Sequence, residues 1–344
     1  MLQIRENKPL APLTTLGVGG AARIFAEVSS DDEVIEAFEY AATRDLPVFV
    51  LGGGSNILVS DQGFDGLVIR ISNKGILSEN LNAPRPIITV SAGENWDKFV
   101  AYCVENDLAG VECLSGIPGS VGGTPVQNVG AYGQEVSETI VSVHSYDRNA
   151  GRFVDLVNRD CCFAYRTSIF NTTERDRYVV LGVVFQLRRG GEPRIEYKDL
   201  RERFEGKCPT LAGTREAVLD IRRSKSMVID ENDPNSQSAG SFFKNPVIEE
   251  PAYRVLKGKF PDIPCFPADP GRVKVPAAWL IERAGFNKGF VLGNAGLSTN
   301  HTLAIINRGH ASAEEIVALK SMIQHKIRQT FGIELQPEPV FVGF

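Results

Sequence analysis

The stretch that most constrains this chain is 114–133, which reads LSGIPGSVGGTPVQNVGAYG. Six of its twenty residues are glycine, and this density predicts backbone at positive φ or backbone that lies very close to another group. Pro118 and Pro125 stiffen the stretch, so it lacks the composition of a flexible linker. Gln127 and Asn128 add amide donors and acceptors. We therefore expect main-chain N–H groups here to hold an anionic or ring-containing ligand, although a run of tight turns would have a similar composition.

A second glycine-rich turn, GGGSN at 52–56, directly follows the apolar run 46–51, which reads as a strand. A strand that ends in three glycines, Ser and Asn is compatible with a phosphate-binding turn. The turn does not match G-x-G-x-x-G, and no long helix is predicted after it, so the two common nucleotide fingerprints both fail. Taken alone, the motif leaves a phosphate site and a plain tight turn as equal alternatives.

The bulk composition describes an ordinary globular protein. The 344 residues suffice for two or three domains, and 43% of them are hydrophobic and 23% charged. A net charge of −5 argues against a nucleic-acid partner. We see neither a signal-peptide pattern nor an apolar run of membrane-spanning length, and we expect a cytoplasmic protein with no membrane partner. The six cysteines form no C-x-x-C pair and there are four histidines, so we expect reduced, mostly buried thiols and no metal site.

Periodicity predicts a mixture of helices and strands. Ser30 is placed to cap a helix over 31–45 that has acidic residues in its first turn. The runs 141–149 and 152–157 are typical of a hairpin. A long amphipathic helix is predicted over 311–332, ending at Gly332, with an apolar stripe of Ile316, Leu319, Ile323 and Ile327.

Three side chains could carry chemistry. Arg166 follows Tyr165 in a mainly apolar segment and needs either a structural carboxylate or an anionic ligand as partner. Ser241 is not in a G-x-S-x-G motif, so it is either a turn or cap residue or a proton donor in a closed pocket. Glu338 lies between two prolines that would hold its carboxylate in one direction, or it is a surface residue in a turn.

Two lysines are equally ambiguous. Lys225 follows Arg222 and Arg223 in a basic cluster, and Lys274 lies in RVKVP. A solvated basic face is the default interpretation, but a diphosphate would use the same residue types.

Five motifs occur in the order and spacing of one family: GGGSN at 52–56, SGIPGSVGGTPVQNVGAYG at 115–133, YRTS at 165–168, GSFFKNP at 240–246 and LQPE at 335–338. By these motifs the chain resembles, over nearly its full length, the UDP-N-acetylenolpyruvoylglucosamine reductase (MurB) family, in the subclass with a substrate-loop tyrosine. The resemblance implies an α+β fold with a two-part FAD-binding domain of the vanillyl-alcohol-oxidase type and a C-terminal substrate domain. The implied bounds are 1–75 with 334–344, then 76–225, then 226–333.

The resemblance also implies an activity. The enzyme would be a monomer that reduces UDP-N-acetylglucosamine enolpyruvate to UDP-N-acetylmuramate for peptidoglycan, with NADPH as co-substrate and non-covalent FAD. Flavin N5 would deliver hydride to C3, and Ser241 would then protonate C2. Arg166 and a protonated Glu338 would stabilise the negative charge that develops at C2 and spreads into the substrate carboxylate.

Other site residues follow from the same resemblance. The substrate pocket would contain Tyr165, the loop residue Tyr197, Lys225, Asn245, Lys274 and His301. The FAD would be held by Gly52, Gly53, Gly54, Ser55, Asn56, Gly116, Ile117, Pro118, Gly119, Gly122, Gly123, Gln127, Asn128, Gly130, Ala131 and Tyr132.

The sequence departs from the family pattern in places. Pro339-Val340 follows Glu338, where relatives often carry a basic residue two positions after the glutamate. Gln336 stands where an acid is common, and 226–239 is long and polar. Two alternative functions are another FAD oxidoreductase of this fold, such as an alcohol oxidase, and a non-catalytic binder of nucleotide sugars.

Overall fold

The computed structural model of the chain describes residues 2–344, which divide into two compact units. Unit 1 comprises the N-terminal residues through Lys8, Ala22–Gly54 and Asp65–Val228. Unit 2 comprises Pro9–Ala21, Ser55–Phe64 and Ile229–Phe344. Both units contain helices and sheets, so the predicted α+β class is confirmed. The expected three-part division of the chain stays a prediction.

The first sheet of unit 1 has four strands in the order β1 (Ile4–Pro9), β2 (Ala21–Val28), β5 (Phe64–Ile71) and β3 (Val48–Leu51). Helix α1 (Asp31–Ala42) begins where the sequence predicts, because the Ser30 side chain accepts a hydrogen bond from the N–H of Glu33. Val34, Ala37 and Ala41 are buried on α1 in one apolar cluster with side chains of β2 and β5. The helix thus covers this sheet with its apolar face.

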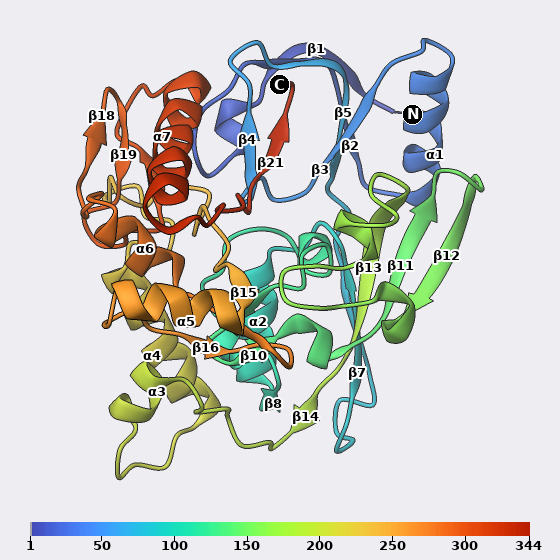
Figure 1. The fold of residues 1–344 in the computed structure, drawn as a ribbon. Helices are drawn as coiled ribbons and strands as arrows, with labels where there is room; N and C mark the ends of the chain where they lie inside the picture. Colours follow the sequence, from blue (N-terminus) through green and yellow to red (C-terminus); the bar gives the residue numbers. More distant parts are fainter. Residues whose placement is uncertain (1) are drawn as a thin grey trace. The chain divides into compact units, whose positions relative to one another are not determined.

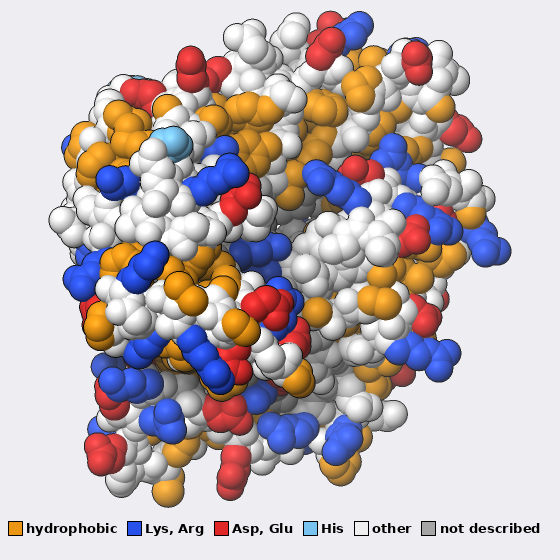
Figure 2. All heavy atoms as spheres, in the orientation of Figure 1, with side chains coloured by type: hydrophobic (Ala, Val, Ile, Leu, Met, Phe, Trp, Pro, Cys, Tyr) orange, Lys and Arg blue, Asp and Glu red, His pale blue; other side chains and the backbone are white. Residues whose placement is uncertain are grey.

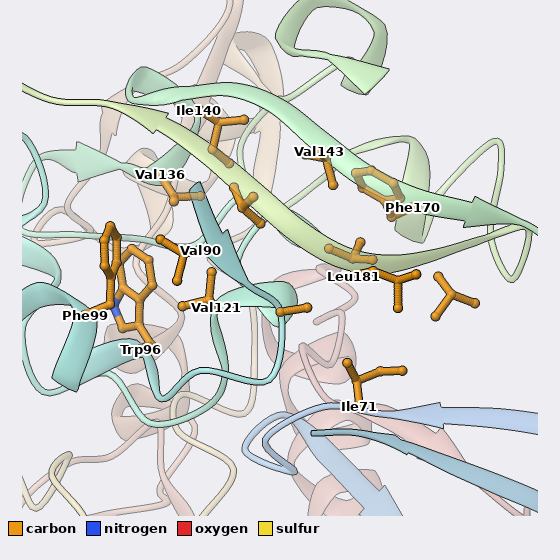
Figure 3. Close-up of a cluster of buried hydrophobic side chains, with 14 of the residues drawn as sticks. Ile71, Val90, Trp96, Phe99, Val121, Val136, Ile140, Val143, Phe170 and Leu181 are labelled. Atoms are coloured by element: carbon orange, nitrogen blue, oxygen red, sulfur yellow. The ribbon is translucent and has the colours of Figure 1, made fainter. Parts of the chain in front are cut away.

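The second sheet of unit 1 is antiparallel and has five strands in the order β12 (Arg152–Val157), β11 (Ile140–Asp147), β13 (Tyr178–Gln186), β7 (Ile87–Ser91) and β6 (Ile76–Glu79) (Figure 1). Strands β11 and β12 form the predicted hairpin. On helix α2 (Trp96–Glu105), Trp96 and Phe99 pack on Phe185 of β13, with ring centres 6.1 and 4.8 Å apart. Figure 3 shows Val121 of the glycine-rich stretch in the same cluster, so the core anchors that stretch.

Shorter elements complete unit 1. Strand β8 (Leu108–Ala109) pairs with β14 (Arg188–Arg189), and β9 (Gly130–Ala131) pairs with β10 (Gln134–Glu135). Helices α3 (Lys198–Arg203) and α4 (Leu211–Ser224) share a small buried cluster through Leu200, Ala217 and Val218. This cluster fixes α3 on α4.

Unit 2 is built from short strands and three helices. Strand β4 (Ile57–Val59) pairs in parallel with the C-terminal strand β21 (Val340–Val342). Two sheets of three strands follow the orders β15 (Val247–Glu249), β17 (Arg272–Lys274), β16 (Phe266–Pro267) and β18 (Val291–Leu292), β19 (Ala295–Leu297), β20 (Ile305–Asn307). The helices are α5 (Glu250–Lys259), α6 (Ala277–Arg283) and α7 (Ala313–Phe331).

Helix α7 confirms the prediction for the C-terminal helix in detail. Ser312 and Glu315 form a capping box at its start, and Gly332 ends it in the left-handed region at φ 69°. The four predicted stripe residues are fully buried in the core of unit 2: Ile316, Leu319, Ile323 and Ile327.

The surface carries charges of both signs, which are interspersed on the face shown in Figure 2. Between residues 2 and 344, no helix is long and apolar enough to cross a bilayer. The same residues contain no group of three or more His, Cys, Asp or Glu side chains that could hold a metal ion. The cysteines are free thiols, but Cys162, Cys208 and Cys265 are exposed, so the expectation of mostly buried thiols is met only by the other three.

Asp97, in the first turn of α2, joins three segments of unit 1. Its carboxylate accepts a 2.6 Å hydrogen bond from the N–H of Gly116 and a two-point ion pair from Arg215 of α4, at 2.6 and 2.8 Å. Burial alone would raise the pKa of Asp97, but the hydrogen bonds from Arg215 and Gly116 outweigh burial and lower it. The start of the glycine-rich stretch is therefore fastened to both helices.

We expect Asp97→Asn to lower the free energy of unfolding by about 1–2 kcal/mol at neutral pH, because charge-assisted hydrogen bonds become neutral ones. A carboxylate with a lowered folded-state pKa stabilises the protein above its unfolded-state pKa and loses this effect as the pH falls through the folded-state value. The difference between the variant and the wild type, measured by urea unfolding followed by circular dichroism, should therefore shrink below roughly pH 4. Asp65→Asn, which removes an exposed ion pair with Arg23, is the control. Equal effects of the two substitutions at neutral pH would contradict the prediction.

Candidate active site

The two glycine-rich motifs of unit 1 meet through their main chains. A Cβ on Gly53 would lie 2.5 Å from Cα of Gly119 and 2.6 Å from the main-chain nitrogen of Ser120. A Cβ on Gly52 would lie 2.9 Å from Oγ of Ser120. Such distances exclude any side chain at Gly53 unless the backbone moves. The expectation of very close backbone approach is confirmed, and the close neighbour of each motif is the other motif.

The GGGSN turn also carries unused hydrogen-bond donors. Within residues 2–344, the N–H groups of Gly53 and Gly54 donate to no other group. Gly54 has φ 67°, the left-handed conformation that glycine adopts without strain. A turn with free N–H groups that point away from other protein acceptors is the donor set that phosphate oxygens need.

The rest of the glycine-rich stretch is held from several sides. The indole nitrogen of Trp96 donates to the carbonyl of Leu114 at 3.0 Å, and a Cβ on Gly122 would collide with Ala92 at 2.5 Å. Asn128 is 1% exposed, and its side-chain amide donates to Glu135 and to the carbonyl of Ala164. The Asn128 side chain therefore serves the protein's own structure, and its main chain remains the part that could contact a ligand.

Arg166 occupies the tip of a tight turn in unit 1. Ala164 and Thr167 exchange two main-chain hydrogen bonds of 3.0 Å, which leaves Tyr165 and Arg166 between them. Arg166 has φ 57°, an unusual conformation for a residue with a long side chain. Its guanidinium donates to the carbonyl of Gly130 at 2.8 Å. A strained Arg that contacts the glycine-rich stretch is a functional candidate on geometric grounds.

A group of tyrosines and cations lies where α3 meets α4. The rings of Tyr132 and Tyr197 meet edge to face with centres 5.3 Å apart, and Nζ of Lys225 lies 3.0 Å from Oδ2 of Asp199. Burial alone would lower the pKa of Lys225, but the hydrogen bond that Lys225 donates to Asp199, together with the electrostatic effects of Tyr132, Asp199 and Tyr197, outweighs burial and raises it. Burial raises the pKa of Tyr132, so its hydroxyl remains a proton donor at neutral pH.

Arg222 adds a buried cation to this group. It donates to the carbonyl of Met227 at 2.6 Å, and desolvation lowers its pKa although Tyr132 and Asp97 oppose that shift. Its Nε is buried and has no hydrogen-bond partner within residues 2–344. This nitrogen lies 3.3 Å from the position that a Cβ on Gly116 would take, so Arg222 packs against the start of the glycine-rich stretch.

Ser241 and His301 come together in unit 2 although 60 residues separate them. Oγ of Ser241 lies 3.3 Å from Nε2 of His301. Gly240 precedes the serine at φ 73°, and the N–H of Phe242 binds the carbonyl of Leu303 at 2.8 Å. The histidine is therefore a hydrogen-bond partner of Ser241, which the sequence alone did not indicate.

Glu338 lies on the segment that pairs with the chain just after Ser241. The N–H of Glu338 donates to the carbonyl of Phe242 at 2.9 Å, and Phe243 pairs with Pro337 in an antiparallel bridge. Asn56 fixes the same segment from its other side, because its side-chain amide donates to the carbonyl of Glu338 at 3.2 Å. Glu338 thus directly follows an isolated bridge at Pro337, and its main-chain N–H is bound to the segment after Ser241.

Other predicted site residues have structural contacts of their own. The side-chain oxygen of Asn245 accepts from the N–H of Ala277 at 2.9 Å and so caps α6. Lys274 ends β17. Arg166, Tyr165, Tyr197 and Lys225 belong to unit 1, whereas Ser241, Asn245, Lys274, His301 and Glu338 belong to unit 2.

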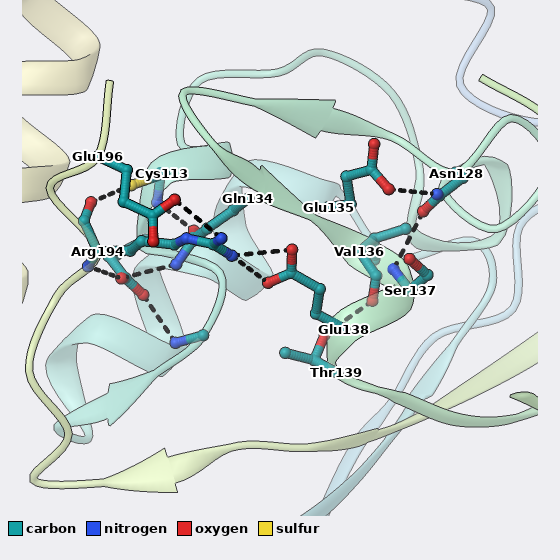
Figure 4. Close-up of polar contacts among 12 residues, drawn as sticks. Cys113, Asn128, Gln134, Glu135, Val136, Ser137, Glu138, Thr139, Arg194 and Glu196 are labelled. Carbon is teal, nitrogen blue, oxygen red and sulfur yellow. Dashed lines mark hydrogen bonds and ion pairs between the residues drawn. The ribbon is translucent and has the colours of Figure 1, made fainter. Parts of the chain in front are cut away.

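One polar network of unit 1 was not predicted. Glu112 is fully buried and accepts hydrogen bonds from Gly110, Gln134 and the main chain of Arg194. The guanidinium of Arg194 binds both carboxylate oxygens of Glu138 and pairs with Glu196 (Figure 4). A glutamate beside the glycine-rich stretch was a visible signal, but the partner residues lie up to 82 positions away in the chain.

Comparison with known proteins shows that two segments of the chain match described protein families. The family described as "FAD binding domain" matches residues 22–156, and that described as "UDP-N-acetylenolpyruvoylglucosamine reductase, C-terminal domain" matches residues 233–342. The free N–H groups of the GGGSN turn fit a cofactor that carries phosphates.

Curated relatives extend the match to the full chain. The chain is 47% identical to the UDP-N-acetylenolpyruvoylglucosamine reductase of Thermobifida fusca, with 98% of each chain covered. It is 44% identical to that of Streptomyces coelicolor, over 99% of this chain and 91% of the relative. The crystal structure of the MurB reductase from Thermus caldophilus has the same fold, with a TM-score of 0.68 over 99% of this chain and 100% of that one at 24% identity. The chain therefore belongs to the UDP-N-acetylenolpyruvoylglucosamine reductase (MurB) family.

Proposed function

We propose that the protein is an NADPH-dependent flavoenzyme that reduces UDP-N-acetylglucosamine enolpyruvate to UDP-N-acetylmuramate for peptidoglycan synthesis. The observation that carries the proposal is the pairing of the Ser241 and Glu338 segments, together with the contact between Ser241 and His301. A hydroxyl donor and a carboxyl group on two segments that hydrogen-bond to each other match the needs of an enolpyruvyl reduction, in which one carbon must be protonated while negative charge is stabilised nearby.

Ser241 is proposed as the proton donor to C2 of the enolpyruvyl group. A hydroxyl is a weak acid, but a carbanion is basic enough to take its proton. His301, 3.3 Å from Oγ of Ser241, would orient the hydroxyl and return a proton to it after transfer. The hydrogen bond from Phe242 to Leu303 holds the backbone next to the serine, which fixes the direction of Oγ.

Arg166 and a protonated Glu338 are proposed to stabilise the negative charge that spreads from C2 into the substrate carboxylate. The strained turn keeps the Arg166 guanidinium against Gly130, and pairing with Phe242 keeps Glu338 in place. Donors that are fixed before the reaction need no reorganisation when charge develops.

The GGGSN turn and the glycine-rich stretch are proposed to hold FAD without a covalent bond. The free N–H groups of Gly53 and Gly54 would bind its diphosphate, and the main chain from Gly116 to Tyr132 would contact its ring system. When bound, FAD would supply the two-electron chemistry by taking hydride from NADPH at N5 and passing it to C3 of the enolpyruvyl group.

The substrate's UDP portion is proposed to contact a second set of residues. Lys225 would bind its diphosphate, and Tyr197, one residue before α3 and 44% exposed, would act as the loop tyrosine of its subclass. Tyr165, Asn245, Lys274 and His301 complete the proposed pocket. The proposal includes a cytoplasmic location and a monomeric enzyme.

The first test concerns the contact between the two glycine motifs. We expect Gly53→Ala to weaken FAD binding by at least roughly tenfold, because the added Cβ would displace the backbone of Gly119 or of the GGGSN turn. FAD affinity is measured by titrating the apoprotein and following flavin fluorescence. Gly258→Ala is the control, since a Cβ there meets nothing within 4 Å. A Gly53→Ala protein that binds FAD as tightly as the control would show that the contact is not needed.

Ser241→Ala tests the proton donor. Reduction of the flavin by NADPH should proceed at nearly the wild-type rate, because this step needs no proton at C2. Reoxidation by UDP-N-acetylglucosamine enolpyruvate should slow on the order of 10²–10⁴-fold. Anaerobic stopped-flow absorbance measures both half-reactions separately. If both slowed equally, the serine would have a structural role, and if the substrate failed to reoxidise even the wild-type flavin, the activity itself would be wrong.

Glu338→Gln tests the carboxyl group. We expect the same pattern, with the second half-reaction slower on the order of 10²-fold, because a neutral amide stabilises the developing charge less well than the acid does. Glu334→Gln is a matched control, since Glu334 lies four residues earlier and is exposed. Equal rates for the two variants would leave Glu338 with a purely structural role.

A further inference from the structure

Asp199 forms an ion pair with Lys225, the cation that we assign to the substrate's diphosphate. Its Oδ2 lies 3.0 Å from Nζ of Lys225, and the two side chains are 38% and 35% exposed. Lys225 caps the end of α4, and Asp199 lies in the first turn of α3. A carboxylate and a phosphate oxygen bind an ammonium group through the same kind of contact, and two anions close to one ammonium repel each other, so the carboxylate opposes phosphate binding here.

The surroundings of Lys225 are built for an anion. The electrostatic neighbours of Lys225 include Tyr132 and Tyr197, and Tyr132 also interacts with the buried cation Arg222. Two hydroxyl donors, one ammonium and one guanidinium thus occupy one region of unit 1. Asp199 is the acidic side chain that binds this ammonium directly.

The backbone that carries Asp199 is fixed at both ends. Leu200 is fully buried against α4, and Arg203 pairs with Asp220 of α4. Before α3, Arg194 is held by Glu112, Glu138 and Glu196 (Figure 4). The Asp199 side chain can therefore leave Lys225 by rotating about its own bonds while α3 stays in place.

We propose that Asp199 binds the ammonium group of Lys225 in the ligand-free protein and is displaced by the diphosphate of the substrate. Asp199 thereby lowers the affinity of the site for phosphorylated ligands. This inference rests on the proposed role of Lys225. A phosphorylated ligand that approaches Lys225 is repelled by Asp199 until that carboxylate moves away, whereas a ligand without phosphate leaves the pair intact. The carboxylate also keeps Lys225 paired and charged while the site is empty.

UDP and uridine serve as the ligand with phosphate and the ligand without phosphate. We expect Asp199→Asn to bind UDP roughly two- to fivefold more tightly than the wild type, because a partly exposed ion pair no longer competes. Uridine affinity should not change. In turnover, the variant should have a lower KM for the UDP-sugar substrate at an unchanged kcat, since the gain is equal in the ground state and the transition state. Isothermal titration calorimetry of the FAD-loaded protein at low ionic strength measures both ligands.

Three further variants control the experiment. Glu202→Gln removes the same charge from the same helix but pairs with the exposed Lys198, so UDP affinity should stay at the wild-type value. Asp199→Glu keeps a competing carboxylate and should remain close to the wild type. Asp199→Ser replaces Asp199→Asn if the asparagine variant does not fold, as judged by circular dichroism.

Lys225→Gln separates the two proposals. If it leaves UDP affinity unchanged, the assignment of Lys225 to the diphosphate is wrong. If it weakens UDP binding while Asp199→Asn binds UDP no more tightly than the wild type, the Asp199 inference alone is overturned. Tighter UDP binding by Glu202→Gln to the same degree would also overturn it, because the effect would then be a general change of charge.

Discussion

The close approach of Gly53 to Gly119 and Ser120 is the constraint on which the candidate cofactor site depends. The turn cannot bear a side chain at Gly53, and each motif limits the paths open to the other. The contact is held from behind by the core of unit 1, through Val121 and the hydrogen bond from Trp96 to Leu114. Asp97 ties the first glycine of the stretch to α2 and α4. Because these supports are rigid, the free N–H groups of the GGGSN turn keep their direction without a ligand.

Some polar side chains of the site stabilise the protein's own structure, and others remain available to a ligand. The motifs contain three asparagines whose side chains form hydrogen bonds within the protein. Asn128 binds Glu135, Asn56 binds the Glu338 segment, and Asn245 binds the start of α6. Ser241 and Lys225 have instead one contact each that a ligand could replace or use, to His301 and to Asp199. Motif residues can therefore hold reactive groups in place as well as contact a ligand.

Much of the fold could be predicted because its signals are local. The serine cap of α1, the hairpin of β11 and β12, and the stripe and terminal glycine of α7 follow from hydrogen bonding and periodicity within a few residues. The Glu112–Arg194 network and the Asp97–Arg215 pair could not be predicted, because their partners lie 82 and 118 residues apart and carry no joint pattern in the sequence. Long-range ion pairs depend on how the helices pack, which local patterns do not specify.

The sequence by itself determined the family, through five motifs in fixed order, and the conformational freedom that glycine alone supplies at 52–54 and 116–133. It left open whether Ser241, Glu338 and Lys225 were ordinary surface residues. Only the tertiary structure decided that Ser241 contacts His301, that the main-chain N–H of Glu338 binds Phe242, and that Lys225 is bound by Asp199. The physical reason is that a side chain's hydrogen-bonding partners and burial come from segments distant in the chain, and these set its chemistry.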